Sequence, residues 1–191
     1  ATDSSGVERT ITMNPPDNQN GTALVTVSVS DGSETVSQQF TATVTAVNDV
    51  PVVTSTPITS ATEDVGYSYT LTATDIDGDA LTYSATTVPS WLSFDASTRV
   101  LSGTPINDNV GGHSVVLSVT DGTATETQSF TVTVANTNDT PVLASISDPT
   151  AVLEDGDNVV VTVSPTDIDS GASLTVTVTT NNGALFPSES I

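Results

Sequence analysis

Three aspartates stand close together in the segment ATDIDGDAL, at positions Asp75, Asp77 and Asp79. Like charges at this spacing repel one another unless water or a cation screens them. Carboxylate oxygens are the ligands that calcium prefers, and calcium takes about six to eight of them at flexible geometry. The chain has no cysteine and one histidine, so it offers no ligand cluster for zinc or copper. This segment alone is weak evidence for calcium, and its alternative is a set of solvated turn aspartates.

The overall charge supports a cation partner and excludes several other functions. The 191 residues include 23 acidic and 2 basic ones, for a formal net charge of −21. Nucleic-acid binding needs a basic footprint, and anionic membranes attract basic segments, so neither partner is expected. No apolar run approaches the roughly 18 residues of a membrane span, so we expect no direct membrane insertion. Val, Leu, Ile and Thr dominate, which is a composition typical of strands.

An internal repeat positions the acidic residues. The segment VSVSDGSETVSQQFTATVTAVNDVP ends at Pro51, and the similar LSVTDGTATETQSFTVTVANTNDTP ends at Pro141, 90 positions later. A second pair of segments, TEDVGYSYTLTATDIDGDAL and LEDGDNVVVTVSPTDIDSGASL, matches with one or two insertions. One repeat is therefore about 90 to 100 residues long, the length of a small β-sandwich domain.

Within each repeat, short runs such as YSYTLTAT and QSFTVTVAN alternate apolar residues with Ser or Thr. This alternation predicts half-buried strands, and turn residues every 8–12 positions or so are typical of an antiparallel β-sandwich. The Asp-Gly pairs at 31–32 and 121–122 predict hairpins between the last two strands of a repeat. The sequence therefore predicts an all-β protein built from tandem antiparallel β-sandwiches.

The repeat divides the chain into three expected parts. Residues 50–139 form one complete sandwich repeat, 1–49 match its C-terminal half, and 140–191 match its N-terminal half. Half a sandwich exposes unpaired edges and an open core. We therefore expect 140–191 to be completed by 1–49 of an adjacent copy or neighbouring repeat, head to tail. A continuous array of repeats and separate copies that complete each other both remain open.

The stretch VPSWLSFDASTRVLSGTP, residues 88–105, resembles a signature of dystroglycan-type cadherin-like, or immunoglobulin-like, domains. Its pattern is Pro-x-Trp-Leu-x-Phe followed by Leu-x-Gly-Thr-Pro. Residues 9–32 and 178–187 are similar instead to related cadherin-like repeats of giant bacterial surface proteins. The resemblance implies immunoglobulin/cadherin-like sandwiches, an extracellular or bacterial cell-surface location, and tandem repeats in a large adhesin.

Placed on the predicted sandwich, the acidic residues converge on two junctions between repeats. Cadherin-like repeats use a first-strand Glu, an Asp-x-Asp loop and an Asn-Asp linker, and all three are present here. The expected calcium ligands of the first junction are Asn48, Asp49, Glu63, Asp64, Asp75, Asp77 and Asp121. Those of the second junction are Asn138, Asp139, Glu154, Asp155, Asp167 and Asp169, with Asp31 from an adjacent copy. Asp79 has no counterpart in the second repeat and is expected to be accessory at best.

The remaining distinctive residues favour structural roles. Arg9 and Arg99 are the only basic residues, and they occupy equivalent positions 90 apart. Trp91 stands in an apolar stretch and is expected in the core or an interface rather than on a sugar-binding platform. His113 has no recognisable nucleophile elbow beside it, and the paired carboxylates lie in turns at a junction, where no aromatic-rich cleft is predicted. We therefore expect no enzymatic activity.

These features favour a calcium-stiffened extender, a structural repeat of a bacterial extracellular adhesin or surface filament. One alternative is a self-assembling filament subunit joined head to tail by half-domain complementation. Another is an adhesion module that itself binds a glycan or a protein. For an extender, a glycan or surface-protein ligand would bind elsewhere in the parent protein.

Overall fold

A computed structural model describes residues 9–151, 159–169 and 171–180, and the structural statements below refer to these residues. Nearly all of its regular elements are strands, with one short 3-10 helix, η1 (Asn107–Asn109). The predicted all-β fold is confirmed. No helix in the described ranges is long and apolar enough to cross a membrane.

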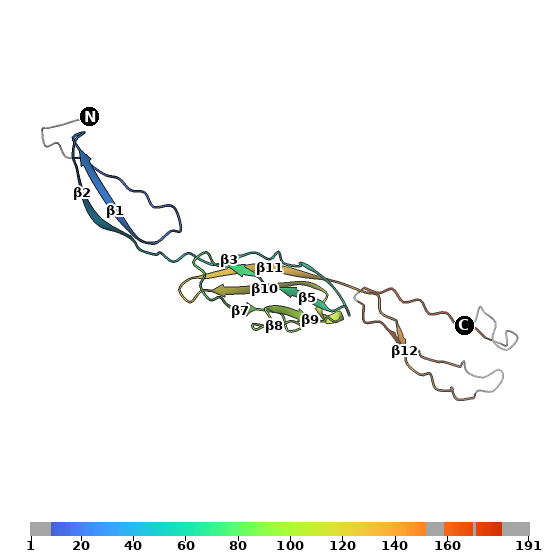
Figure 1. Cartoon of the computed structure of the whole chain (residues 1–191). Helices are drawn as coiled ribbons and strands as arrows, with labels where there is room; N and C mark the ends of the chain where they lie inside the picture. The colour runs from blue at the N-terminus through green and yellow to red at the C-terminus, as the bar shows by residue number, and fades with distance from the viewer. Residues whose placement is uncertain (1–8, 152–158, 170, 181–191) are drawn as a thin grey trace.

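The middle of the chain folds as two facing sheets (Figure 1). The larger sheet has the order β4 (Ser60–Thr62), β11 (Thr125–Ala135), β10 (Gly111–Thr120) and β7 (Thr82–Thr87). The smaller has the order β5 (Tyr67–Thr70), β9 (Val100–Gly103) and β8 (Ser93–Asp95), and a short pair joins β3 (Val52–Val53) to β6 (Ala73–Thr74). These pairs are antiparallel except β4 with β11, which is parallel.

The core lies between the two sheets because apolar residues alternate along their strands. On β10 and β11 the inward-facing Val and Leu residues are fully or almost fully buried, whereas Thr131 and Thr133 on the other face are exposed. The opposing sheet contributes Tyr67 and Tyr69, and Tyr69 stacks edge-on against Phe130 at 5.7 Å. Burial of each large apolar side chain stabilises the fold by about 1.5–3 kcal/mol. The buried apolar residues are Tyr67, Tyr69, Leu71, Leu92, Leu101, Val115, Leu117, Val119, Val132 and Val134.

The segment 88–105 forms the β8–β9 hairpin and a tight turn within it. Oδ1 of Asp95 accepts hydrogen bonds from the Ser97 hydroxyl at 2.6 Å and the Ser97 N–H at 2.8 Å. These bonds, with a weaker one from the Thr98 N–H, lower the pKa of Asp95 to about 2. Arg99 follows at a positive φ of 64°, and its guanidinium lies 5.6 Å from the centre of the Tyr83 ring. The other arginine, Arg9, is exposed.

The two ends of the described chain repeat parts of this sandwich. The hairpin of β1 (Gly21–Ser30) and β2 (Thr35–Val44) has the same pairing register as β10 and β11, 90 positions earlier. At the other end, β12 (Val142–Leu143) pairs with β13 (Pro165–Thr166) in the register of β3 and β6. The hairpin and the β12 region extend from opposite ends of the middle sandwich (Figure 1).

Candidate metal centres

The first junction lies where the linker after β2 reaches the middle sandwich. Asp75 and Asp77 follow β6, Asp121 occupies the turn between β10 and β11, and Asn48 and Asp49 lie in the linker. The Asp49 N–H donates to Oδ2 of Asp77 at 2.7 Å, and Nδ2 of Asn48 donates to Oδ2 of Asp121 at 2.9 Å. Five of the seven residues predicted for this junction therefore lie in segments that these hydrogen bonds bring together.

A compact carboxylate cluster forms in the loop after β6. Asp75, Asp77 and Asp79 each place one carboxylate oxygen within 4.8 Å of the others. Oδ1 of Asp75 accepts the N–H groups of Asp77 at 2.9 Å and Asp79 at 3.3 Å, and Gly78 supplies the positive φ of 81° in this turn. Oδ2 of Asp75 is buried with no hydrogen-bond partner among the described residues. Such a buried oxygen is costly without a partner, and a cation would supply one.

A cleft of about 270 Å³ adjoins this junction. It is lined by the loop 15–20, by the end of β2 and the linker, and by Asp49 and Asp77. Asp17 in that loop adds a third carboxylate and was not among the predicted ligands. The repeat carried a signal for it, because Asp17 stands 90 positions before Asn107. Asn107 connects the two sides of the second junction, because its Nδ2 donates to the Ile168 carbonyl at 2.7 Å.

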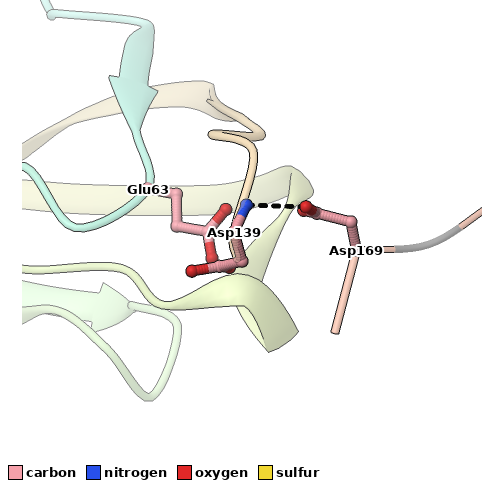
Figure 2. A group of neighbouring side chains, drawn as sticks. All are labelled: Glu63, Asp139 and Asp169. Atoms are coloured by element: carbon pink, nitrogen blue, oxygen red, sulfur yellow. Dashed lines mark hydrogen bonds between the residues drawn. The ribbon is translucent and has the colours of Figure 1, made fainter. Parts of the chain in front are cut away.

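The second junction gathers carboxylates from three separate segments (Figure 2). Glu63 follows β4, Asp139 follows β11, and Asp169 follows β13, and one oxygen of each lies within 4.8 Å of the others. The Asp139 N–H donates to Oδ2 of Asp169 at 2.7 Å, and the Asp169 N–H donates to Oδ1 of Asp167 at 2.8 Å. The same two bonds occur at the first junction, where the Asp49 N–H donates to Oδ2 of Asp77 and the Asp77 N–H donates to Oδ1 of Asp75.

The amide side chains of the two linkers also correspond. Nδ2 of Asn138 donates to the Asp139 carbonyl at 2.8 Å, as Asn48 does to the Asp49 carbonyl at 2.9 Å. The second junction has one additional donor, because Nδ2 of Asn136 reaches Oδ1 of Asp169 at 2.8 Å. Alanine stands at the corresponding place of the first linker. The only sequence signal for this contact is therefore this difference between the two linkers.

Among the described residues of the second junction, Glu63 is the most buried acid. Its side chain is 2% exposed, and its Oε2 accepts the Thr137 N–H at 3.1 Å. Removing a carboxylate from water is unfavourable unless opposite charge or several donors compensate it. One backbone donor is little compensation for a full charge. Glu63 therefore has the surroundings of a ligand for a cation rather than of a solvated turn residue.

The structure corrects the assignment of Glu63 and Asp64 to the first junction. After β3, which lies at the first junction, the chain runs the length of the sandwich before β4 pairs in parallel with the end of β11. Glu63 thus donates its N–H to the Ala135 carbonyl at 3.0 Å, beside the second junction. The Asp64 N–H donates to the Pro105 carbonyl at 2.9 Å. The sequence argument placed both residues on the first strand, just inside the domain, but they follow the end of β4.

The remaining predicted ligands lie elsewhere. Asp31 occupies the turn of the β1–β2 hairpin, at the end away from the middle sandwich (Figure 1). Its Oδ1 accepts the N–H groups of Ser33 at 2.9 Å and Glu34 at 2.8 Å. Its contribution to a second junction requires an adjacent copy and remains a prediction. Glu154 and Asp155 lie outside the described residues.

Burial and neighbouring charges raise the pKa of Asp139 at the second junction. Partial burial is the largest cause, and the charges of Asp169, Asp64 and Asp167 add to it, so the pKa of Asp139 rises above its usual 3.8. A raised carboxyl pKa means that the folded state binds a proton more readily than the unfolded state. Stability is therefore lost as the pH rises from below 3.8 through the raised pKa. At the first junction, hydrogen bonds from the Ala124 N–H and then the Asn48 amide lower the pKa of Asp121.

The raised pKa of Asp139 can be tested by titration. In calcium-free buffer, the Asp139 carboxyl followed by carbon-13 NMR is expected to titrate above pH 3.8. Added calcium is expected to move its midpoint below 3.8, because a cation favours the charged form. Asp95 is the internal control, with a midpoint near 2 that calcium leaves unchanged. An Asp139 midpoint indifferent to calcium would contradict a metal site here.

Trp91 lies at the edge of the core. Its ring contacts Tyr67 edge-on at 5.9 Å and His113 edge-on at 5.8 Å. Nε1 of Trp91 is buried without a hydrogen-bond partner in the described part of the chain. The ring is thus engaged by neighbouring rings of the sandwich, and these contacts favour a structural role over a sugar-stacking one.

Comparison with known families agrees with this geometry. Residues 50–135 match the family model described as "Putative Ig domain". Over these residues the chain is similar to Ig-like domains. No curated protein matches the chain. Ig-like domains are typical of non-enzymatic modules and occur mainly in extracellular proteins.

Solved structures similar to the chain include cadherins and a polysaccharide hydrolase. Extracellular cadherin domains 1–4 of protocadherin gamma B7 share the fold, with TM-score 0.50 and 22% identity over 78% of this chain and 41% of that chain. Human protocadherin-24 EC1-2 gives TM-score 0.41 and 22% identity over 63% of this chain and 62% of that one. An endo-fucoidan hydrolase from glycoside hydrolase family 107 is 31% identical, with TM-score 0.42 over 61% of this chain. The match spans 19% of the hydrolase chain.

Proposed function

We propose that the chain is a calcium-stiffened structural module of a bacterial extracellular adhesin or surface filament. The observation that carries this proposal is the pair of acidic junctions at opposite ends of one Ig-like domain. Each junction ties a linker N–H to the second aspartate of an Asp-x-Asp loop at 2.7 Å. A repeated acidic junction is the arrangement that a chain of stiffly linked domains requires.

The donor sets fit calcium. At the first junction the candidate ligands are Asp75, Asp77 and Asp121, with the linker residues Asn48 and Asp49. All offer oxygen, and they come from three segments, which suits the flexible geometry of a calcium site. The buried, unpartnered Oδ2 of Asp75 supports this fit. A bound calcium ion would supply the positive charge that these residues lack.

The second junction fits the same ion. Its candidate ligands are Glu63, Asp139, Asp167 and Asp169, which come from both sides of the linker. Glu63 belongs to the middle domain, whereas the two loop aspartates belong to the segment beyond the linker. A cation held by both would oppose bending at the linker. Without a cation, the same carboxylates repel one another across it.

Each bound ion is expected to contribute a modest free energy, and its main effect is on the stiffness of the linker. Extracellular modules bind calcium with dissociation constants of about 0.1–1 mM. At a calcium concentration ten times the dissociation constant, each site is stabilised by about 1.4 kcal/mol, and its open form becomes about tenfold rarer. Stiffening of the linker is therefore the main functional consequence, rather than folding of the domain itself.

Hydrogen–deuterium exchange at the two linkers tests this proposal. The N–H groups of Asp49 and Asp139 are expected to exchange about tenfold more slowly in calcium than in EDTA, because each donates to a ligand aspartate. Asp169→Asn should remove the protection at Asp139 and leave that at Asp49 unchanged, so each junction is the control for the other. Equal exchange in calcium and EDTA at both linkers would refute the proposal.

A further inference from the structure

The β1–β2 hairpin presents a face that is buried in the middle domain. Its register is that of β10 and β11, so Val25, Val27 and Val29 correspond to buried Val115, Leu117 and Val119. On β2, Phe40 corresponds to Phe130, which packs on Tyr69. In the hairpin this face is only partly covered: Val25 and Val27 are half-buried, whereas Val29 is 71% exposed and Phe40 is 42% exposed. The sequence has thus retained core residues on a face that the described residues leave partly open.

The segment after the second linker presents the complementary part of a sandwich. The pairing of β12 with β13 reproduces that of β3 with β6, with the second strand of the pair displaced by 92 positions. Val161 therefore corresponds to buried Tyr69. Val161 is 44% exposed, and Val176 and Val178 further along are also exposed. Val161 is therefore the counterpart of a side chain that packs on β11 in the middle domain.

One polar pair supports the same match. In the middle domain, Nε2 of Gln128 donates to the Ser55 carbonyl at 2.8 Å, which joins β11 to the segment after β3. Gln38 stands 90 positions before Gln128, and Ser145 stands 90 positions after Ser55. The hairpin therefore carries the donor of this contact, and the segment after β12 carries the residue whose carbonyl accepts it.

The two parts of one chain lie apart. The hairpin and the β12–β13 segment extend from opposite ends of the middle domain (Figure 1). Hydrogen bonds from Asp49 and Asp139 tie the two linkers to their loops at these ends. A second copy of the chain can bring the two parts together without breaking either junction.

We propose that the apolar face of β1–β2 binds residues 140–151, 159–169 and 171–180 of a second copy of this chain, so that the two parts form one Ig-like sandwich. Repetition of this contact joins copies head to tail. The interface is heterologous, because the two surfaces differ, and such contacts build open filaments when they do not close into a ring. The net charge of −21 opposes association, so assembly is favoured at physiological salt, where charges are screened beyond about 8 Å.

Two substitutions block the two surfaces separately. Phe40→Asp places a charge on the apolar face of the hairpin, and Val161→Asp places one on the complementary segment. Thr41→Asp is the matched control, because Thr41 pairs with Leu24 and lies on the opposite face of the same strand. Sedimentation velocity of the full chain, over a series of concentrations in calcium and in EDTA, measures the assembly.

Wild-type protein and Thr41→Asp are expected to form larger species as concentration rises, while Phe40→Asp and Val161→Asp each remain monomeric. A mixture of these two blocked variants is expected to form a 1:1 dimer and nothing larger, because one intact surface of each kind remains. Wild-type protein that stays monomeric throughout would overturn the proposal. So would a mixture that stays monomeric, or Val161→Asp that still associates through its hairpins. None of these outcomes depends on whether calcium occupies the junctions.

Discussion

Calcium is expected to raise the melting temperature of the middle domain by about 5 °C or more, and Asp75→Asn/Asp77→Asn is expected to abolish that rise. The stabilisation is about 1.4 kcal/mol for one site at ten times its dissociation constant. In a domain of this size, 1 kcal/mol changes the melting temperature by about 4–8 °C. Trp91 is the only tryptophan and lies in the middle domain, so its fluorescence follows this transition.

The direction in which the double substitution changes stability in EDTA provides a second test of the metal site. The three carboxylates of the loop lie within 4.8 Å of one another, so the double variant removes repulsion when no cation is present. It should therefore melt at the same temperature as the wild type, or higher, in EDTA. Glu126→Gln removes an exposed carboxylate of β11 that is not among the candidate ligands, so it should keep the full response to calcium. Identical melting curves for the wild type in calcium and EDTA would refute the metal site.

Gly103→Ala is expected to destabilise the middle domain by about 2–3 kcal/mol, the upper part of the range for overpacking. A Cβ at Gly103 would overlap the Trp91 carbonyl oxygen, and it would lie 3.0 Å from the Trp91 carbonyl carbon and 3.2 Å from the Leu92 Cα. All three are backbone atoms, so no side-chain rotation relieves the overlap. The melting temperature should fall by about 10 °C or more. This contact explains the glycine in Leu-x-Gly-Thr-Pro.

Gly112→Ala is the matched control for this prediction. It also lies in a strand of the sandwich, but a Cβ there would meet only Cγ2 of Thr131, at 3.5 Å, an ordinary contact. Its effect should be neutral or stabilising by up to about 1 kcal/mol, because alanine restricts the unfolded chain. Equal effects of the two substitutions, measured by the same fluorescence melt, would show that the Trp91 backbone does not constrain Gly103.

The fold class and the hairpins could be predicted because their signals are local. Alternating apolar residues define which face of a strand is buried, and Asp-Gly turns set the hairpin register. The observed register from Gly111↔Val134 to Thr120↔Thr125 follows from that turn. The Asp-x-Asp loop was predictable for the same reason, since Asp75 bonds to N–H groups two and four residues ahead.

The sequence could not predict which carboxylates lie together, because that depends on how far each strand runs in the folded domain. Glu63 is 12 positions from Asp75 in the sequence, yet it lies with Asp139 and Asp169. The pairing of β4 with β11 is parallel and non-local, and it decides which end of the domain Glu63 reaches. Asp17 likewise reaches the first junction only because its loop folds against the linker.

By itself, the sequence determined the repeat, the strands, the turns and the types of ligand, because each depends on side-chain pattern or on hydrogen bonds over a few residues. Only the tertiary structure decided which acidic residues share a junction and which apolar faces are left uncovered. Those properties depend on how far a strand runs and which strand it pairs with. They arise from packing between segments more than 70 residues apart, such as Glu63 with Thr137 (74 positions) and Asn48 with Asp121 (73 positions), which no local pattern specifies.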